Sequence, residues 1–401
     1  METTRIIILL IGLLTWNGIL LSQPVELPSP SDKIPLPKIE IENKQPVWSP
    51  DGREIAYLSN KDCEDKHQLN LYLINPNNSR LRKFPLVSGS QGIQYNRCSF
   101  SWSPDGKKIA FVFGDIKPFL AGSTTNIYIA NSDGTNRRNL TKQNRWESYK
   151  FVSWSPDGTK ICYLHENHYG PDIIKIIDAN GKFVYKLTEG ATHPIWAPDS
   201  KRIAFIKQKA IIIMDIDGKN EQTIKIPTST FRIYWPLQEQ GIFVEKHYNV
   251  DVIKIKSPSE WTRVVNATPS KDVWRSDDPC PPTAEINSTL SPNGKEVVFN
   301  QEGDIWKTTI MPHQEGSLFA NQPFNLTETE KIKEEAPYWS PDGKRIVYVR
   351  DKEIWVMDSD GKNQKQLTFE RTKAIEEAIK KRQEEIKTRE KIIKEALEKK
   401  D

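Results

Sequence analysis

A short motif that recurs along most of the chain constrains the fold more than any other feature. Five copies are close to Trp-Ser-Pro-Asp-Gly, and they contain Trp48, Trp102, Trp154, Trp196 and Trp339. Two weaker copies place Trp235 and Leu290 at the same point of the motif. Neighbouring copies lie between 39 and 55 residues apart, a spacing typical of the four-stranded repeats of propellers.

Each copy of the motif is followed by the same succession of short segments. Two apolar runs come first, such as residues 55–58 and 71–74 in the first repeat, and a polar turn such as 131–134 follows them. The last segment ends in Leu-Thr at 140–141, 187–188, 326–327 and 367–368. The runs are too short for helices and rich in β-branched and aromatic residues, so they indicate strands. In Ser-Pro-Asp-Gly, Pro fixes its backbone angle and Gly accepts a positive φ, which favours a tight hairpin turn.

These repeats predict an all-β fold over residues 46–369. We expect a seven-bladed β-propeller of four-stranded antiparallel blades, with six blades as the alternative. A four-stranded sheet cannot bury both faces by itself, so neighbouring repeats must stack. We interpret the repeated indoles as packing between blades rather than as ligand contacts: Trp48, Trp102, Trp154, Trp196, Trp235 and Trp339.

The first 45 residues have the pattern of an export signal and a linker. Arg5 precedes an uncharged run from Ile6 to Leu21, which is short for a bilayer span and suits a signal peptide over residues 1–22. An uncleaved membrane anchor is the alternative, because Leu20 is a poor residue for the cleavage site. Residues 23–45 are rich in Pro and form an extended spacer. We therefore expect an extracytoplasmic protein, located in the bacterial periplasm and in contact with the membrane only if the signal is not cleaved.

The last segment, residues 370–401, has the pattern of a charged amphipathic helix. Apolar residues lie on one helical face at spacings of 4, 7, 7 and 4, at Ile375, Ile379, Ile386, Ile393 and Leu397. Arg382 and Arg389 interrupt a second heptad position, which argues against a long homodimeric coiled coil. The segment is either a solvated tail or a recognition helix for another cell-envelope protein.

The charge of the chain excludes one class of partner. Lys and Arg number 57 and Asp and Glu number 53, and the resulting net charge is +4. Residues 371–401 account for +3 of it. Because a general nucleic-acid binder has a strongly basic body, we expect no nucleic-acid partner.

The repeat resembles the TolB-like β-propeller repeat, on the Trp-Ser-Pro-Asp-Gly motif, the paired apolar runs and the Leu-Thr strand ends. The resemblance covers residues 46–368. TolB itself has an α/β domain before a six-bladed propeller, and residues 23–45 leave no room for that domain, so we expect a relative rather than TolB. The related peptidases carry a hydrolase domain after the propeller. No Gly-x-Ser-x-Gly elbow, P-loop or His-Glu-x-x-His motif occurs here.

The positions of the histidines suggest an enzyme as the alternative to a purely binding role. Five of the six, His67 among them, fall in connections that share one face of a propeller, and the binding candidates are His165, His168, His193 and His247. Converging imidazoles could bind a divalent metal, although two related repeats could also have kept a solvated loop sequence. Oligogalacturonate lyases resemble this propeller type and hold a metal with His. The alternative function is therefore a metal-dependent carbohydrate-active enzyme.

Two of the four cysteines could form a disulfide. Cys63 and Cys98 lie in connections of adjacent repeats on one face, and an exported protein could join them in a disulfide.

The leading functional hypothesis is a non-enzymatic scaffold or ligand-binding module of the cell envelope, without a cofactor. Its binding surfaces would be one propeller face and the helix at 370–401.

Overall fold

The computed structural model describes most of the repeat region and the C-terminal helix. It covers residues 41–61, 63, 68–84, 93–94, 99–115, 124–141, 148–167, 170–225, 230–235, 241–246, 249–257, 260–263, 288–312, 318–320, 323–329 and 332–398. Contacts divide the chain into two compact units, and residues 40–373 form the strand-containing one. Residues 374–401 belong to the other unit. The proposed signal peptide and linker lie outside the described residues, except for the last residues of the linker.

Strands in the described residues form seven antiparallel sheets, numbered here in chain order. The first contains β1 (Asn43–Trp48), β2 (Ile55–Ser59), β3 (Gln68–Ile74) and β4 (Leu81–Lys83), with β5 (Ile93–Gln94) also on β3. The second contains β6 (Phe100–Trp102), β7 (Lys108–Asp115), β8 (Thr124–Asn131) and β9 (Arg138–Asn139). The third contains β10 (Ser148–Trp154), β11 (Lys160–Glu166), β12 (Ile173–Asp178) and β13 (Phe183–Glu189).

The other four sheets repeat this order. The fourth contains β14 (Thr192–Trp196), β15 (Arg202–Lys207), β16 (Ala210–Asp215) and β17 (Gln222–Lys225). The fifth contains β18 (Thr230–Tyr234), β19 (Gly241–Lys246), β20 (Asn249–Ser257) and β21 (Glu260–Arg263). The sixth contains β22 (Ser288–Leu290), β23 (Glu296–Gln301), β24 (Asp304–Pro312) and β25 (Leu318–Ala320), with β26 (Phe324–Asn325) also on β24. The seventh contains β27 (Glu334–Trp339), β28 (Arg345–Arg350), β29 (Glu353–Asp358) and β30 (Lys365–Gln366).

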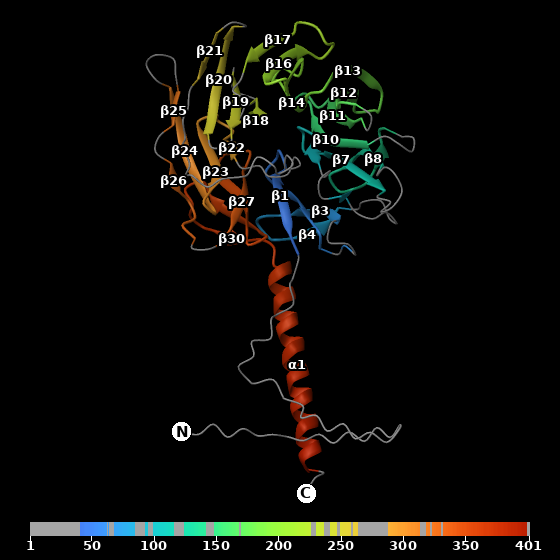
Figure 1. Cartoon of the computed structure of the whole chain (residues 1–401), viewed down its shortest axis with the longest axis vertical. Coiled ribbons are helices and arrows are strands. Elements are labelled where there is room, and N and C mark those ends of the chain that lie inside the picture. The colour runs from blue at the N-terminus through green and yellow to red at the C-terminus, as the bar shows by residue number, and fades with distance from the viewer. Residues whose placement is uncertain are drawn as a thin grey trace, which may run out of the picture. The chain divides into compact units, whose positions relative to one another are not determined.

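The sheets build an all-β propeller. Figure 1 shows them following one another around a common centre in chain order, and the labelled strands β1, β10, β14, β18 and β22 lie nearer this centre than the last strands of their sheets. The seventh sheet returns to the first, because Trp48, Ile55 and Tyr57 pack in one buried cluster with residues of β28 and β29. The predicted propeller of four-stranded antiparallel sheets and the predicted C-terminal helix are confirmed.

The Trp side chains fill the spaces between successive sheets. Trp102 packs with Leu71 and Leu73 of the preceding sheet, and Trp196 packs with Cys162 and Leu164. The other four occupy equivalent clusters with the sheet before theirs, namely Trp48, Trp154, Trp235 and Trp339. Two of the indoles also bond across the gap, since Trp196 Nε1 donates to Ser153 O (3.1 Å) and Trp339 Nε1 to Thr289 O (3.3 Å). Removal of this large apolar area from water is the main force that joins the sheets.

Each Ser-Pro-Asp-Gly turn is closed by its own side chains. In the seventh sheet Ser340 Oγ donates to Asp342 Oδ1 (2.6 Å) and accepts the backbone N–H of Arg345 (2.9 Å). The same Ser bond recurs at Ser49, Ser103, Ser155 and Ser291, where Asn293 replaces the Asp. These bonds hold the turn locally, as the sequence motif predicts.

A bulge interrupts the innermost strand three residues before the motif Trp. Gln45, Phe151, His193 and Ala336 have φ between 51° and 64°, and the strand register shifts beside each of them. A residue with a side chain is strained in this left-handed region, so the bulge persists only because the flanking strand pairs fix it.

The helix α1 (Glu370–Glu398) follows β30 directly and covers 29 residues. Ile379 and Ile386 on its apolar stripe are 37% and 43% exposed. Among the described helices, none is both long enough and apolar enough to cross a membrane.

Candidate functional site

The two ends of the sheets differ in their chemistry. We call the end that carries the Ser-Pro-Asp-Gly turns the turn face. The opposite end is the loop face, where the second strand of a sheet leads to the third and the fourth leads to the next sheet. Described residues of the loop face include Glu42–Lys44, Ser148–Lys150, His165–Asn167, Thr192, His193, Lys207–Ala210, Glu334, Arg350–Glu353 and Thr368.

The junction of the first and seventh sheets at the loop face is polar and buried. Asn43 Nδ2 donates to Glu353 Oε2 (3.1 Å) and to Thr368 Oγ1 (3.3 Å), and the Thr368 hydroxyl donates to the same carboxylate. The three side chains are 1%, 3% and 2% exposed. Lys352 adds an ion pair to Glu42 beside them. This network joins the first strand of the propeller to its last sheet without a shared strand.

A second buried network joins the sixth and seventh sheets. Glu334 is fully buried, pairs with the guanidinium of Arg350 and accepts the backbone N–H of Ile305 at 3.3 Å. Arg350 lies over the rings of Tyr348 and Trp355 at 5.3 and 4.6 Å. Burial raises the pKa of Glu334, while Thr327 and Arg350 partly oppose that rise. The pair stabilises the interface only while both partners are present.

The Thr of the repeated Leu-Thr pair has a structural role that the sequence did not reveal. Its hydroxyl accepts a backbone N–H from the first half of the third strand, from Ile127 to Thr141, from Ile305 to Thr327 and from Ile354 to Thr368. Each bond gives a buried N–H group an acceptor. The recurrence of Leu-Thr at four strand ends was the signal from which this role could have been inferred.

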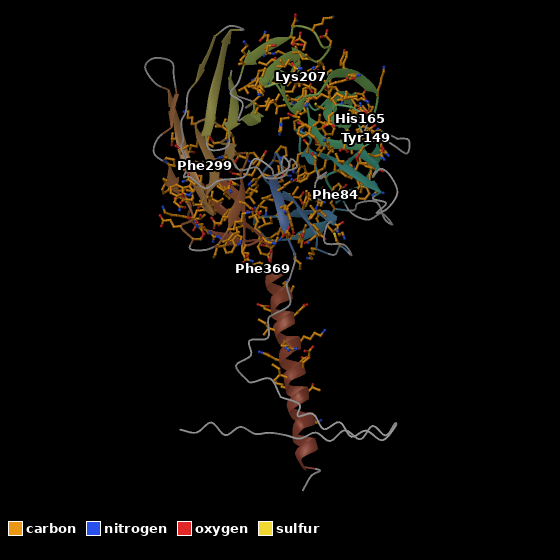
Figure 2. The ribbon with its side chains drawn as sticks, in the orientation of Figure 1. Phe84, Tyr149, His165, Lys207, Phe299 and Phe369 are labelled. Carbon is orange, nitrogen blue, oxygen red and sulfur yellow. The ribbon has the colours of Figure 1, made fainter. Side chains whose placement is uncertain are left out.

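Ionisable side chains also gather on the loop face of the third sheet. Lys150 Nζ lies 2.7 Å from Asp172 Oδ2 and 3.9 Å from Glu166 Oε1. The His165 and Tyr149 rings lie side by side, with centroids 5.3 Å apart (Figure 2). Lys207 of the fourth sheet, also labelled in Figure 2, donates to Thr188 Oγ1 of the third (2.8 Å).

The four predicted His residues are only partly accounted for. His165 is the penultimate residue of β11 and His193 lies at the bulge of β14, so both are on the loop face, in neighbouring sheets. His168 and His247 lie outside the described residues. No group of three or more His, Cys, Asp or Glu side chains in the described part of the chain is arranged to hold a metal ion. The metal hypothesis therefore stays a prediction.

The predicted disulfide also stays a prediction, because Cys98 lies outside the described residues. Cys63 is half-buried, and its sulfur accepts a hydrogen bond from Asn70 Nδ2 at 3.1 Å.

The connections on the loop face differ in length around the ring. Eight residues join the second and third strands in the first and second sheets, and six join them in the third. Only two residues do so in the fourth to seventh sheets, for example Gln208 and Lys209 between β15 and β16. Among the connections between second and third strands, the longer ones therefore lie on three consecutive sheets.

Comparisons of sequence relate these repeats to known propellers. Residues 44–232 match the family described as TolB beta propeller domain, and residues 317–391 match the family described as Dipeptidyl peptidase IV N-terminal region. Dipeptidyl-peptidase 5 of Porphyromonas gingivalis is 26% identical over an alignment of 260 residues, and the match covers 49% of this chain and 36% of that protein. This chain thus aligns with about a third of the length of that relative.

Solved structures with similar folds come from several kinds of protein. The propeller domain of the Trilobed protease from Pyrococcus furiosus is 15% identical with a TM-score of 0.52, and the match covers 82% of this chain and 98% of that one. An oligogalacturonate lyase in complex with manganese is 11% identical with a TM-score of 0.53, covering 78% and 88%. At these identities the likeness concerns the fold alone.

Proposed function

We propose that this chain, whose repeats belong to the TolB-like β-propeller repeat family, is a non-enzymatic binding protein of the cell envelope. The propeller would present its loop face to a ligand or protein, and the C-terminal helix would recruit a second protein. In this proposal each of the seven sheets is one blade, the protein acts outside the cytoplasm and residues 1–22 direct its export.

One observation carries the proposal. Polar and charged side chains on the loop face bond to one another, as Glu334 and Arg350 do within the seventh sheet and as Glu353 and Asn43 do between the seventh and first sheets. Groups committed to such contacts are suited to holding a surface in shape. The long connections of the first three sheets then supply the variable part of that surface, as loops on rigid scaffolds commonly do.

Cross-linked affinity capture from the native cell envelope tests this proposal. The full-length protein would be compared with a version that ends at Phe369, and with two pairs of charge substitutions. One pair is on the loop face (Lys209→Glu with Asp351→Lys) and the matched pair is on the turn face (Lys107→Glu with Asp217→Lys). We expect the loop-face pair to reduce capture by the propeller and the turn-face pair to leave it unchanged. Equal capture by all variants would contradict a binding role of the loop face.

A metal-dependent carbohydrate-active enzyme is the second candidate. Its support is that His165 and His193 lie on one face of neighbouring sheets, in a fold that resembles a manganese-containing lyase. Metal analysis of the purified protein separates the two functions. An enzyme of this kind would hold about one divalent metal per chain and lose it on His168→Ala or His247→Ala, whereas a binding protein would show no such loss.

A further inference from the structure

The helix α1 carries charged residues inside its apolar stripe. With Ile379 and Ile386 at the first position of successive heptads, Arg382 and Arg389 take the fourth position, where a coiled coil has its second apolar residue. Ile379 and Ile386 are exposed, as is most of the described surface of the helix. The stripe therefore alternates an apolar residue with a guanidinium over two heptads.

Arg382 has hydrogen-bonding capacity left over. Its Nη1 donates to Glu385 Oε2 at 2.7 Å, one turn further along the helix. Its Nε is buried and has no hydrogen-bond partner among the described residues. A guanidinium has five N–H donors in a planar fork that fits a carboxylate, so one intrahelical bond does not satisfy it.

A second copy of the helix cannot satisfy these residues. In a parallel pair, Arg382 would face Arg382 across the seam, and Glu385 would face Glu390 at the flanking positions. In an antiparallel pair, each Arg would meet an Ile and remain without a counter-charge inside the seam. Both arrangements place like charges together or leave a desolvated charge unpaired, and both are unfavourable.

We propose that α1 binds an amphipathic helix of another protein, with apolar heptad residues and two carboxylates spaced seven residues apart. Those carboxylates would face Arg382 and Arg389, which lie about 10 Å apart along the helix axis. The Ile residues would supply the buried contact, and the Arg pairs would set register and partner choice. This inference rests on the proposed function and names the class of partner for its helix.

Two synthetic 28-residue helical peptides test the proposal on the full-length protein. Both have Ile and Leu at the heptad core, and they differ only at the two positions that would face the Arg residues, which are Glu in one and Gln in the other. Binding is measured by fluorescence anisotropy. We expect the Glu peptide to bind about tenfold more tightly than the Gln peptide at low salt, and less so as salt rises.

Charge exchange provides the decisive variants. The double variant Arg382→Glu, Arg389→Glu should lose the preference for the Glu peptide and bind a peptide with Arg at those positions instead. The matched control Lys380→Glu, Lys387→Glu changes the same charge on another face of the helix and should alter affinity less than twofold. Circular dichroism checks that each variant keeps its helix.

Three results would overturn the proposal. The Glu and Gln peptides could bind equally, the control could lose as much affinity as the Arg variant, or sedimentation could show dimers of the full-length protein that Ile386→Asp dissociates. Envelope capture that depends on the loop face but not on the helix would leave the proposed function intact and remove only this inference.

Discussion

The two faces of the propeller are built by different means. On the turn face each Ser-Pro-Asp-Gly turn closes on itself, with bonds that span two to five residues, such as Ser340 to Asp342 and Arg345. On the loop face the polar bonds join residues far apart in the chain, such as Asn43 and Glu353. The Ser-Pro-Asp-Gly turns are therefore locally determined, whereas the network around Asn43 on the loop face depends on the closed ring.

The largest effect is expected on the loop face, at Glu334. Glu334→Ala should reduce the free energy of unfolding by about 3–5 kcal/mol, because it leaves the Arg350 guanidinium buried without its partner. Chemical denaturation measures the change. The control Glu335→Ala removes a carboxylate whose partner, Lys333, is largely exposed, so it should cost less than about 1 kcal/mol. Similar losses of unfolding free energy for both variants would contradict a special role of the buried Glu334–Arg350 pair.

A smaller loss is expected at a glycine of the turn face that touches the preceding sheet. Gly361 has φ +85°, and a Cβ there would lie 2.6 Å from the carbonyl oxygen of Leu326. Gly361→Ala should therefore cost about 2–4 kcal/mol, from backbone strain and from the displaced contact.

Gly218 is the matched control for this glycine. It has φ +82° with nothing within 4 Å of an added Cβ, so Gly218→Ala should cost only about 1 kcal/mol. Thermal unfolding measures both variants. Equal decreases in Tm would show that the contact with Leu326 is unimportant.

The Ser of the turn motif should contribute less, because its bonds are local and partly exposed. Ser340→Ala removes one donor and one acceptor, and we expect a loss of about 1 kcal/mol in urea unfolding. Ser132→Ala, in a turn where no side-chain bond of the Ser is described, serves as control. A loss of 3 kcal/mol or more for Ser340→Ala would mean that the turn supports more than itself.

The carboxyls of the two faces should respond to pH in opposite directions. The bond from Ser340 lowers the pKa of Asp342. The ionised carboxylate of Asp342 therefore stabilises the fold above the pKa of the unfolded chain, and this stabilisation is lost as the pH falls through the pKa of the folded protein. Burial raises the pKa of Glu334, so its ionisation makes folding less favourable as the pH rises from the ordinary value of 4.5 through the raised pKa.

Unfolding free energies measured from pH 3 to pH 8 separate the two carboxyls. Asp342→Asn should reduce the decrease in unfolding free energy at low pH. An amide fits this turn, because Asn293 takes the same place in the sixth sheet. Glu334→Gln should flatten the decline at higher pH, although it lowers stability overall. Parallel pH curves for the wild type and both variants would contradict the assignment.

The smallest effect is a gain in stability in a hairpin of the loop face. Lys209 has φ +63° in the two-residue turn between β15 and β16, a conformation that glycine adopts without strain. Lys209→Gly should raise the free energy of unfolding by about 0.5–1 kcal/mol. The control Lys207→Gly, two residues earlier, should instead lower it, because Lys207 bonds to Thr188 from a regular strand. Calorimetry that shows a loss for both would contradict the strain argument.

Much of the propeller could be predicted because its signals are local and repeated. The turn motif, the short apolar runs and the regular spacing identify strands, hairpins and stacking sheets. The bulges could not be predicted, since Gln45, Phe151, His193 and Ala336 share a conformation but no chemical character. The candidate site was predictable only as a face with His residues. Its buried networks involve Asn43, Glu334 and Glu353, which look like ordinary surface residues in the sequence.

The sequence by itself determined the repeat, the turn chemistry, the strand order within each sheet and the helix that begins at residue 370. Each depends on contacts within a few tens of residues, for which periodicity and turn residues are sufficient. Only the tertiary structure decided which polar side chains are buried and how the first sheet meets the last. Residues such as Asn43 and Glu353, 310 positions apart, come together only when the ring closes, and no local pattern records that contact.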